Sequence, residues 1–122
     1  MGAGTPRPGV PVRGSSSGRP VMAALDLLGR RWTLLILWEL SQAPGGFREL
    51  QRRCGRMSSS VLSTRLGELA DVRLVALRED GYHLTRLGED LVESLQPLFV
   101  WSRRWAAESD AGPAPGAPRH DA

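Results

Sequence analysis

The sequence contains no lysine, one cysteine, two histidines and no long apolar segment. One thiol cannot form a disulfide within the chain, and Cys54, His83 and His120 are too few and too scattered to bind a metal. The longest apolar run, residues 34–38, is far shorter than a segment that crosses a bilayer, and no secretion signal opens the chain. We therefore expect no metal, no cofactor and no membrane partner, and we expect a cytoplasmic location.

Catalytic patterns are also absent from the sequence. It has no Ser-His-Asp or Cys-His combination, no paired catalytic carboxylates and no glycine-rich phosphate loop. These absences predict a protein without enzymatic activity.

Positive charge is concentrated in one part of the chain. Although the formal net charge is +3, residues 21–109 hold 12 arginines against 11 acids and are close to neutral. Residues 48–65 contain five arginines and a single acid, Glu49. A local excess of this kind predicts contact with an anionic partner.

The two ends of the chain differ in composition from its middle. Residues 1–20 and 110–122 are rich in glycine, proline, serine and alanine and have little to bury, so we expect two disordered tails. Residues 21–109 carry periodic apolar positions and are long enough for one domain. We predict a single folded domain over this range.

Two helices are predicted at the start of this domain. The first covers residues 21–28 and ends at Gly29. One side of it carries Met22, Leu25 and Leu28. The second covers about residues 32–41 and is apolar almost all round, which is typical of a buried central helix.

The third predicted helix is short and has two distinct faces. Phe47, Leu50 and Cys54 fall on its inner side, whereas Arg48 and Arg52 share the opposite side. We expect these arginines to face solvent.

The fourth predicted helix runs from the N-cap Ser58 to about Val72. Its inward stripe consists of Leu62, Leu66 and Leu69. The side away from that stripe carries Ser60, Ser63, Thr64 and Gly67. This pattern predicts an exposed face of small polar side chains.

Beyond residue 73 the apolar period changes to two. Residues 74–78 and 82–84 are predicted as strands joined by an Asp80-Gly81 turn. Apolar residues then recur at helical spacing as far as Trp105, and we expect Pro97 to break or kink this run into two helices. The predicted order is four helices, a hairpin and the C-terminal helices.

This order is typical of a winged helix-turn-helix, a mainly α fold whose small hairpin is the wing. The fourth helix would enter the major groove of DNA and direct four hydroxyl groups at base edges or phosphates, those of Ser59, Ser60, Ser63 and Thr64. Around it, phosphates would be bound by Arg48, Arg52, Arg53 and Arg56. The sequence therefore predicts a partner of double-stranded DNA.

Four segments resemble one family of regulators. Residues 24–37, ALDLLGRRWTLLIL, are similar to the A-L-D-x-[LI]-G-G-K-W-[TS]-x-x-I-L signature of the HxlR family, and residues 47–50, FREL, match its F-x-E-L. Residues 57–69, MSSSVLSTRLGEL, resemble its recognition helix, and residues 82–88, YHLTRLG, resemble its Y-x-L-T-x-x-G. The resemblance covers about residues 19–106.

The resemblance implies a bacterial transcriptional regulator that acts as a homodimer on a pseudo-palindromic operator. It places five residues at or beside DNA: Ser58, Ser59, Ser60, Ser63 and Arg65. It also implies a dimer interface made by the first and last helices: Leu25, Leu95, Leu98, Phe99, Trp101 and Trp105. We expect a repressor, because no segment is left over to recruit a polymerase.

Three departures from the family pattern modify these expectations. Arg19-Pro20-Val21 stands where oxidant-sensing members have Cys-Pro-Val, which excludes redox sensing at that position. The shortened wing carries Glu79 and Asp80, whose charge repels phosphate, so wing contacts should contribute little. Gly67 stands where arginine is frequent, and we therefore expect a different base preference.

Other interpretations remain open at the level of sequence. The near-neutral domain and its acidic wing also fit a protein-interaction module on a winged-helix scaffold, and a small-molecule effector pocket between the dimer helices is equally compatible. Cys54 is expected to be a core residue rather than a reactive thiol. Trp101 and Trp105 fit a core or a dimer surface equally, and Arg30 and Arg31 are expected to be solvated.

Overall fold

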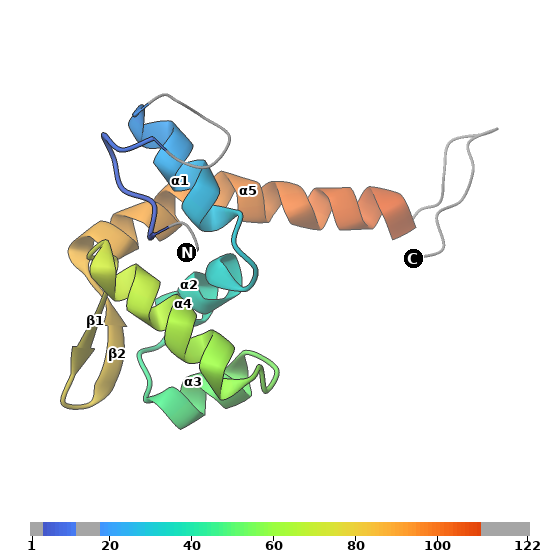
Figure 1. The fold of residues 1–122 in the computed structure, drawn as a ribbon. Helices are drawn as coiled ribbons and strands as arrows, with labels where there is room; N and C mark the ends of the chain where they lie inside the picture. Colours follow the sequence, from blue (N-terminus) through green and yellow to red (C-terminus); the bar gives the residue numbers. More distant parts are fainter. Residues whose placement is uncertain (1–3, 12–17, 111–122) are drawn as a thin grey trace. The chain divides into compact units, whose positions relative to one another are not determined.

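The computed structural model describes residues 4–11 and 18–110, and the chain divides into two compact units, Met1–Val92 and Glu93–Ala122. The first unit contains α1 (Pro20–Leu28), α2 (Thr33–Gln42), α3 (Phe47–Arg53), α4 (Ser59–Asp71), β1 (Val75–Arg78), β2 (Gly81–Leu84) and the start of α5 (Arg86–Asp110) (Figure 1). This order confirms the predicted, mainly helical fold with a two-stranded hairpin. No helix within the described residues is long and apolar enough to cross a bilayer.

The predicted tails lie only partly within the described residues. Residues 1–3, 12–17 and 111–122 are outside them, so the disorder of the tails stays a prediction. Within residues 4–11, Arg7 forms an ion pair with Asp71 at the end of α4. Residues 4–11 therefore have a defined contact with α4 within the first unit.

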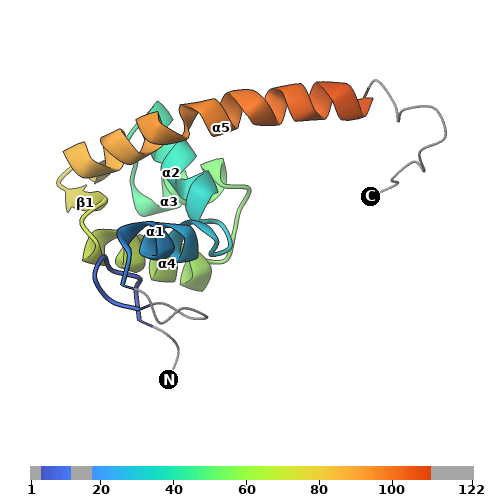
Figure 2. The same ribbon diagram turned by 90° about the horizontal axis from the view of Figure 1, so that it is seen from above.

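α2 lies at the centre of the first unit, with α1 on one side and α3 on the other (Figures 1 and 2). Its residues Ile36, Leu37 and Leu40 are buried. An apolar helix surrounded on several sides is what the continuous hydrophobic sequence predicted.

α1 begins at Pro20, whose missing N–H is no loss in the first turn of a helix. It ends before Gly29 as predicted. Ala23 and Leu27 are the residues that it buries, whereas Met22 and Leu28 are half-buried. Leu25 is 60% exposed. An exposed Leu25 is compatible with the place at a dimer interface that the family resemblance implies.

α3 and α4 pack on this centre through single apolar faces. Leu50 and Cys54 of the α3 segment are buried, and α4 buries Leu62, Leu66 and Leu69. Both stripes are those predicted from the sequence, because side chains three and four residues apart share one side of a helix. Each buried leucine stabilises the fold by about 1.5–3 kcal/mol.

The hairpin is antiparallel, with Val75 opposite Leu84 and Arg78 opposite Gly81. Its loop is therefore Glu79-Asp80, and the predicted Asp80-Gly81 turn is wrong by one residue. Gly81 has a φ of +122°, and a Cβ built on it would lie 2.5 Å from the Gly45 carbonyl carbon. Glycine is required here because the chain before α3 packs directly on the strand.

α5 runs as one helix from Arg86 to Asp110 with Pro97 inside it. The predicted division into two helices at Pro97 is therefore wrong. A proline removes one main-chain donor and crowds one preceding carbonyl, a local loss of about 3 kcal/mol that a helix of 25 residues absorbs. Within the first unit α5 lies close to the hairpin, since a Cβ on Gly88 would be 2.1 Å from the Leu74 carbonyl oxygen.

Candidate nucleic-acid interface

The polar face of α4 is exposed. It lies opposite the buried leucine stripe and carries small side chains: Ser59, Ser60, Ser63, Thr64 and Gly67. The N-terminal end of α4 lies beside α3, and its C-terminal end lies beside β1 (Figure 1). The helix therefore presents a strip of hydroxyl groups to solvent, as the sequence predicted.

The turn before α4 is built around Ser58. Its Oγ accepts a hydrogen bond from the Val61 N–H at 3.2 Å, which confirms the predicted N-cap. Gln51 donates from Nε2 to the Met57 carbonyl oxygen at 2.9 Å and so joins α3 to the turn. The left-handed backbone of Gly55, with φ +76°, helps the chain reverse. The Ser58 hydroxyl is thus part of the helix cap.

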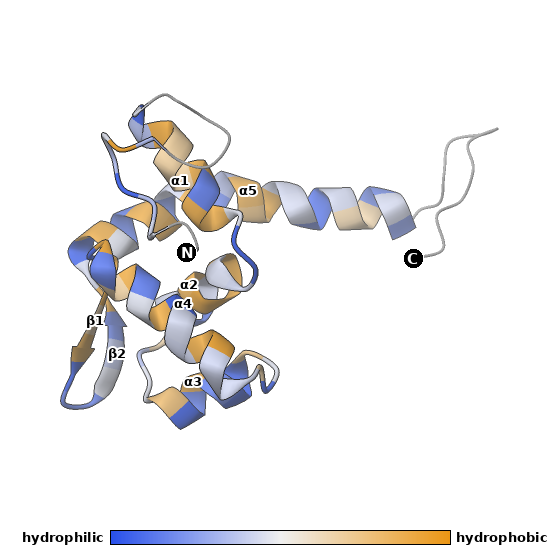
Figure 3. Ribbon diagram, in the orientation of Figure 1, coloured by the Kyte–Doolittle hydropathy of each residue, from blue (hydrophilic) through white to orange (hydrophobic). Residues whose placement is uncertain are grey.

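Three of the predicted phosphate-binding arginines lie on the surface of α3 and of the turn before α4. Arg48 and Arg56 are exposed, and the Arg52 side chain is 67% exposed. Arg52 pairs with Glu49 on the same helix. Because water screens such a surface ion pair, it contributes little, and a phosphate can replace the carboxylate. Figure 3 shows hydrophilic positions on α3 in this region.

The fourth of these arginines, Arg53, is bound by groups at the end of α2 instead of facing solvent. Its side chain is mostly buried, and Nε lies 3.3 Å from a carboxylate oxygen of Glu39. Its Nη2 donates to the carbonyl oxygens of Glu39 and, at 2.8 Å, of Ala43. These carbonyls lie at the C-terminal end of α2, where a helix leaves acceptors unsatisfied. Arg53 therefore caps α2, a role that the sequence did not predict.

Arg65 is also engaged within the first unit. Its Nε donates to the Arg31 carbonyl oxygen at 2.8 Å, and its Nη1 donates to Glu68 Oε1 at 3.1 Å. Arg30 binds the other oxygen of the same carboxylate. The expectation that Arg30 is solvated is wrong, because this ion pair and one to Asp26 hold it. Arg31 is exposed, with its guanidinium 4.8 Å from the Trp32 ring centroid.

Glu68 is the residue of this region that the sequence interpretation missed. Its spacing of three residues from Arg65 on a helix was a usable signal, since side chains at that spacing meet. Its second partner, Arg30, is 38 residues away and has no sequence signal.

The tip of the hairpin is acidic, and Figure 3 shows it as hydrophilic. Glu79 and Asp80 form the loop, and Asp80 Oδ1 lies 2.7 Å from His83 Nε2. This hydrogen bond lowers the pKa of Asp80. Its negative charge makes the tip a poor partner for phosphate.

Cys54 is a core residue, as predicted. Its side chain is buried behind α3. Burial raises the pKa of the Cys54 thiol, and the nearby Glu39 carboxylate raises it further. Since the thiolate is the reactive form, this thiol is poorly suited to redox or covalent chemistry.

The described part of the second unit, residues 93–110, is helical and carries large apolar side chains. Trp101 is 46% exposed and Trp105 62% exposed, and their rings stack with centroids 5.3 Å apart. Leu98 and Val100 are also exposed, whereas Leu95 and Phe99 are partly covered. The two tryptophans are therefore exposed on the described part of this unit.

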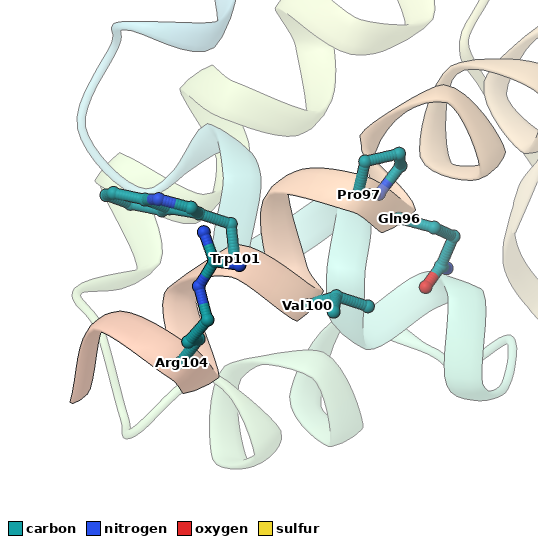
Figure 4. A pocket seen from close by; sticks show the side chains of 5 residues that line it. All are labelled: Gln96, Pro97, Val100, Trp101 and Arg104. Carbon is teal, nitrogen blue, oxygen red and sulfur yellow. The ribbon is translucent and has the colours of Figure 1, made fainter. Parts of the chain in front are cut away.

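An open groove lies on this helix. It is lined by Gln96, Pro97, Val100, Trp101 and Arg104, and its volume is about 490 Å³ (Figure 4). Most of the lining is apolar, and all five side chains come from α5. Such a surface suits an apolar partner better than water.

Comparison with known protein families identifies the family to which the chain belongs. The family described as HxlR-like helix-turn-helix matches residues 27–110, from the end of α1 to the end of α5. The chain belongs to the HxlR family. This match confirms the resemblance that the four sequence motifs indicated.

Named relatives of this HxlR-family chain are transcriptional regulators. An uncharacterized HTH-type transcriptional regulator of Mycobacterium tuberculosis is 35% identical over 103 residues, which are 79% of this chain and 65% of that protein. The HTH-type transcriptional regulator YodB of Bacillus subtilis is 30% identical over 95 residues, which are 72% of this chain and 85% of YodB. The chain thus spans slightly less than two thirds of the mycobacterial relative. These relatives are regulators and not enzymes, as the sequence predicted.

Two solved HxlR-type structures share the fold. The quinone-bound YodB of B. subtilis has a TM-score of 0.60 and 32% identity, covering 72% of this chain and 96% of that one. A possible HxlR family transcriptional factor from Thermoplasma volcanium has a TM-score of 0.63 and 30% identity, covering 69% of this chain and 82% of that one. These matches confirm the winged helix-turn-helix architecture.

Proposed function

We propose that the protein binds double-stranded DNA as a homodimer and represses transcription from the site that it occupies. The observation that carries the proposal is the polar face of α4, whose hydroxyl groups are exposed while its opposite face is fully buried. A helix held in this way can enter the major groove without displacing its own packing.

Serine and threonine at the groove suit close approach. Their short side chains reach base edges or phosphates, and the positive end of the α4 dipole favours the phosphate backbone. In the proposal these contacts come from Ser59, Ser60, Ser63 and Thr64, beside the capping Ser58. Because hydroxyl groups both donate and accept, they discriminate bases less sharply than a bidentate arginine does.

Phosphate contacts are assigned to Arg48, Arg52 and Arg56. All three are exposed, Arg48 and Arg52 on α3 and Arg56 in the turn before α4. Arg53 and Arg65 are left out of this set because partners within the first unit already bind their guanidinium groups. Neutralised phosphates release counterions, so the affinity should fall steeply with salt.

The proposed dimer joins two copies through apolar side chains of α5, with Leu25 of α1 as a further contact. The supporting observation is the exposure of Leu98, Trp101 and Trp105 in one short helical segment. Two-fold pairing would present two α4 helices to half-sites about one helical turn apart. A dimer that covers a promoter excludes other proteins from it, which is why we propose repression.

For a small-molecule effector, the proposal concerns only whether it attaches covalently to the protein. The quinone-bound relative shows that YodB binds a quinone. In this chain the single thiol is buried and has a raised pKa. We therefore propose that an effector of this protein binds without covalent attachment to Cys54.

The direct test is fluorescence anisotropy with a labelled duplex from the upstream region of its own gene, measured over a range of salt concentrations. We expect Arg52→Ala to weaken binding and to reduce the slope of log affinity against log salt by about 0.9 per protomer. Arg86→Ala is the matched control, because Arg86 is also an exposed arginine with an ion-paired neighbour on its own helix. It should behave as wild type.

Absence of any salt-dependent binding to that duplex or to other genomic fragments would refute DNA binding. Capture of a stoichiometric protein partner by such a non-binding protein would favour the interaction module instead.

A further inference from the structure

The Glu68 carboxylate is shared by two arginines. Its Oε1 accepts from Arg65 Nη1 at 3.1 Å, and its Oε2 accepts from Arg30 Nη1. The three side chains are only 16%, 21% and 17% exposed for Glu68, Arg65 and Arg30. Ion pairs that are partly shielded from water are stronger than the exposed pair of Arg52 and Glu49.

Each arginine of this cluster has a further acceptor. Arg65 Nε donates to the Arg31 carbonyl oxygen at 2.8 Å. Arg30 Nη2 donates to the Gly4 carbonyl oxygen at 2.9 Å and lies 3.5 Å from Asp26 Oδ2. The guanidinium of Arg65 is therefore fixed between α4 and the connection from α1 to α2.

The position of Arg65 on α4 makes this restraint relevant to DNA. Arg65 follows Thr64 and lies on the flank between the buried stripe and the exposed face. A helix in the major groove has a sugar-phosphate backbone along each flank. An arginine released at this place would meet phosphate.

We propose that Glu68 is a positioning residue that withholds Arg65 from DNA and thereby lowers the affinity of the α4 surface for phosphate. The proposal rests on the DNA-binding function argued above and names a control element within that same site. Loss of the Glu68 charge leaves Arg65 with neutral acceptors only, the Arg31 carbonyl and the amide oxygen that replaces the carboxylate, and a charged phosphate competes well against both.

The test compares salt slopes for wild type, Glu68→Gln, Arg65→Gln and the double variant on a labelled mixed-sequence duplex. We expect E68Q to bind more tightly and to steepen the slope by about 0.9 per protomer, the value for one added phosphate contact. R65Q should match wild type, and the double variant should match R65Q. A merely structural role for Glu68 would weaken binding without steepening the slope.

The double variant separates release of Arg65 from the general effect of removing a negative charge. A gain of affinity that persists when Arg65 is absent would overturn the proposal. Unchanged slopes in E68Q, with wild type binding normally, would also overturn it and leave DNA binding intact. No salt-dependent binding by wild type would instead defeat the proposed function.

Arg65→Lys provides a second test that keeps the net charge and the carboxylate. Lysine lacks the fork that reaches the Arg31 carbonyl and Glu68 together, so the restraint should weaken. We expect a slope between those of wild type and E68Q. This variant decides the question if E68Q does not fold, since a wild-type slope in R65K would then overturn the proposal.

Discussion

α4 and residues 93–110 of α5 are both helices with apolar and polar side chains, but they use them in opposite ways. In α4 the leucines at 62, 66 and 69 are fully buried and the exposed face carries hydroxyl groups. In residues 93–110 large apolar side chains are exposed, including both tryptophans. The apolar side chains of α4 are buried within its own chain, whereas those of residues 93–110 are still exposed to water.

The difference indicates two kinds of partner. A buried stripe fixes α4 firmly, so its polar face is presented in one orientation to a polar, charged ligand such as DNA. An exposed apolar segment gains stability only when another apolar surface removes it from water. A second copy of the chain provides such a surface, and a symmetric dimer uses the same residues on both sides.

The largest expected effect is the loss of stability when a buried leucine of α4 is shortened. Leu62→Ala leaves a cavity in the core and should reduce the free energy of unfolding by about 2–5 kcal/mol. The loss should not depend on protein concentration in urea denaturation if α4 packs only within its own chain. Ser63→Ala, one residue away on the exposed face, is the control and should change stability by less than about 0.5 kcal/mol. Equal losses in both variants would contradict the assignment of faces.

The next effect concerns the exposed apolar segment. Trp105→Ala removes a 62% exposed ring that stacks on Trp101. A tryptophan at the centre of an interface contributes about 2 kcal/mol or more, so the dimer dissociation constant should rise about 30-fold or more. Sedimentation equilibrium measures this change, and Arg103→Ala on the same segment is the control. A wild-type protein that stays monomeric at all concentrations would refute the proposed dimer.

A substitution at Gly67 on α4 should change protein stability and DNA affinity in opposite directions, by smaller amounts. A Cβ built on Gly67 meets no atom within 4 Å, so packing within the chain does not require glycine there. Gly67→Ala should stabilise the protein by about 1 kcal/mol through helix propensity, yet weaken DNA binding if α4 approaches the groove closely. Ala70→Gly, also exposed on α4, should destabilise the protein with unchanged DNA affinity. Tighter DNA binding by G67A would contradict a close approach.

Much of the fold was predictable from local sequence. Helical spacing gave the inner stripe of α4, Ser58 gave its N-cap, and the change to a period of two gave the hairpin. These features depend on residues a few positions apart, which is the range over which side-chain periodicity is informative. The exposed hydroxyl face followed from the same periodicity.

Features that depend on distant contacts were not predictable. Arg53 caps α2 and Arg30 binds Glu68, and neither pairing leaves a local pattern in the sequence. The hairpin loop was misplaced because Asp-Gly is a common turn signal, whereas Gly81 is required by the backbone at Gly45. An arginine in a basic segment can therefore be assigned to a binding surface only when the structure shows that no partner within the chain already binds it.

The smallest effect concerns the hairpin tip. The tip belongs to the same unit as α4 but is negatively charged, whereas the arginines on α3 and before α4 are positively charged. The hydrogen bond from His83 holds the pKa of Asp80 below its usual range. Because the folded pKa is lowered, the stability from this contact is present at neutral pH and is lost as the pH falls through that pKa. A carboxyl NMR titration should show a higher midpoint for Asp80 in His83→Ala than in wild type. Identical midpoints would contradict the contact, whereas the expected rise would show that His83 favours the ionised form of Asp80 and so helps to keep the tip negatively charged.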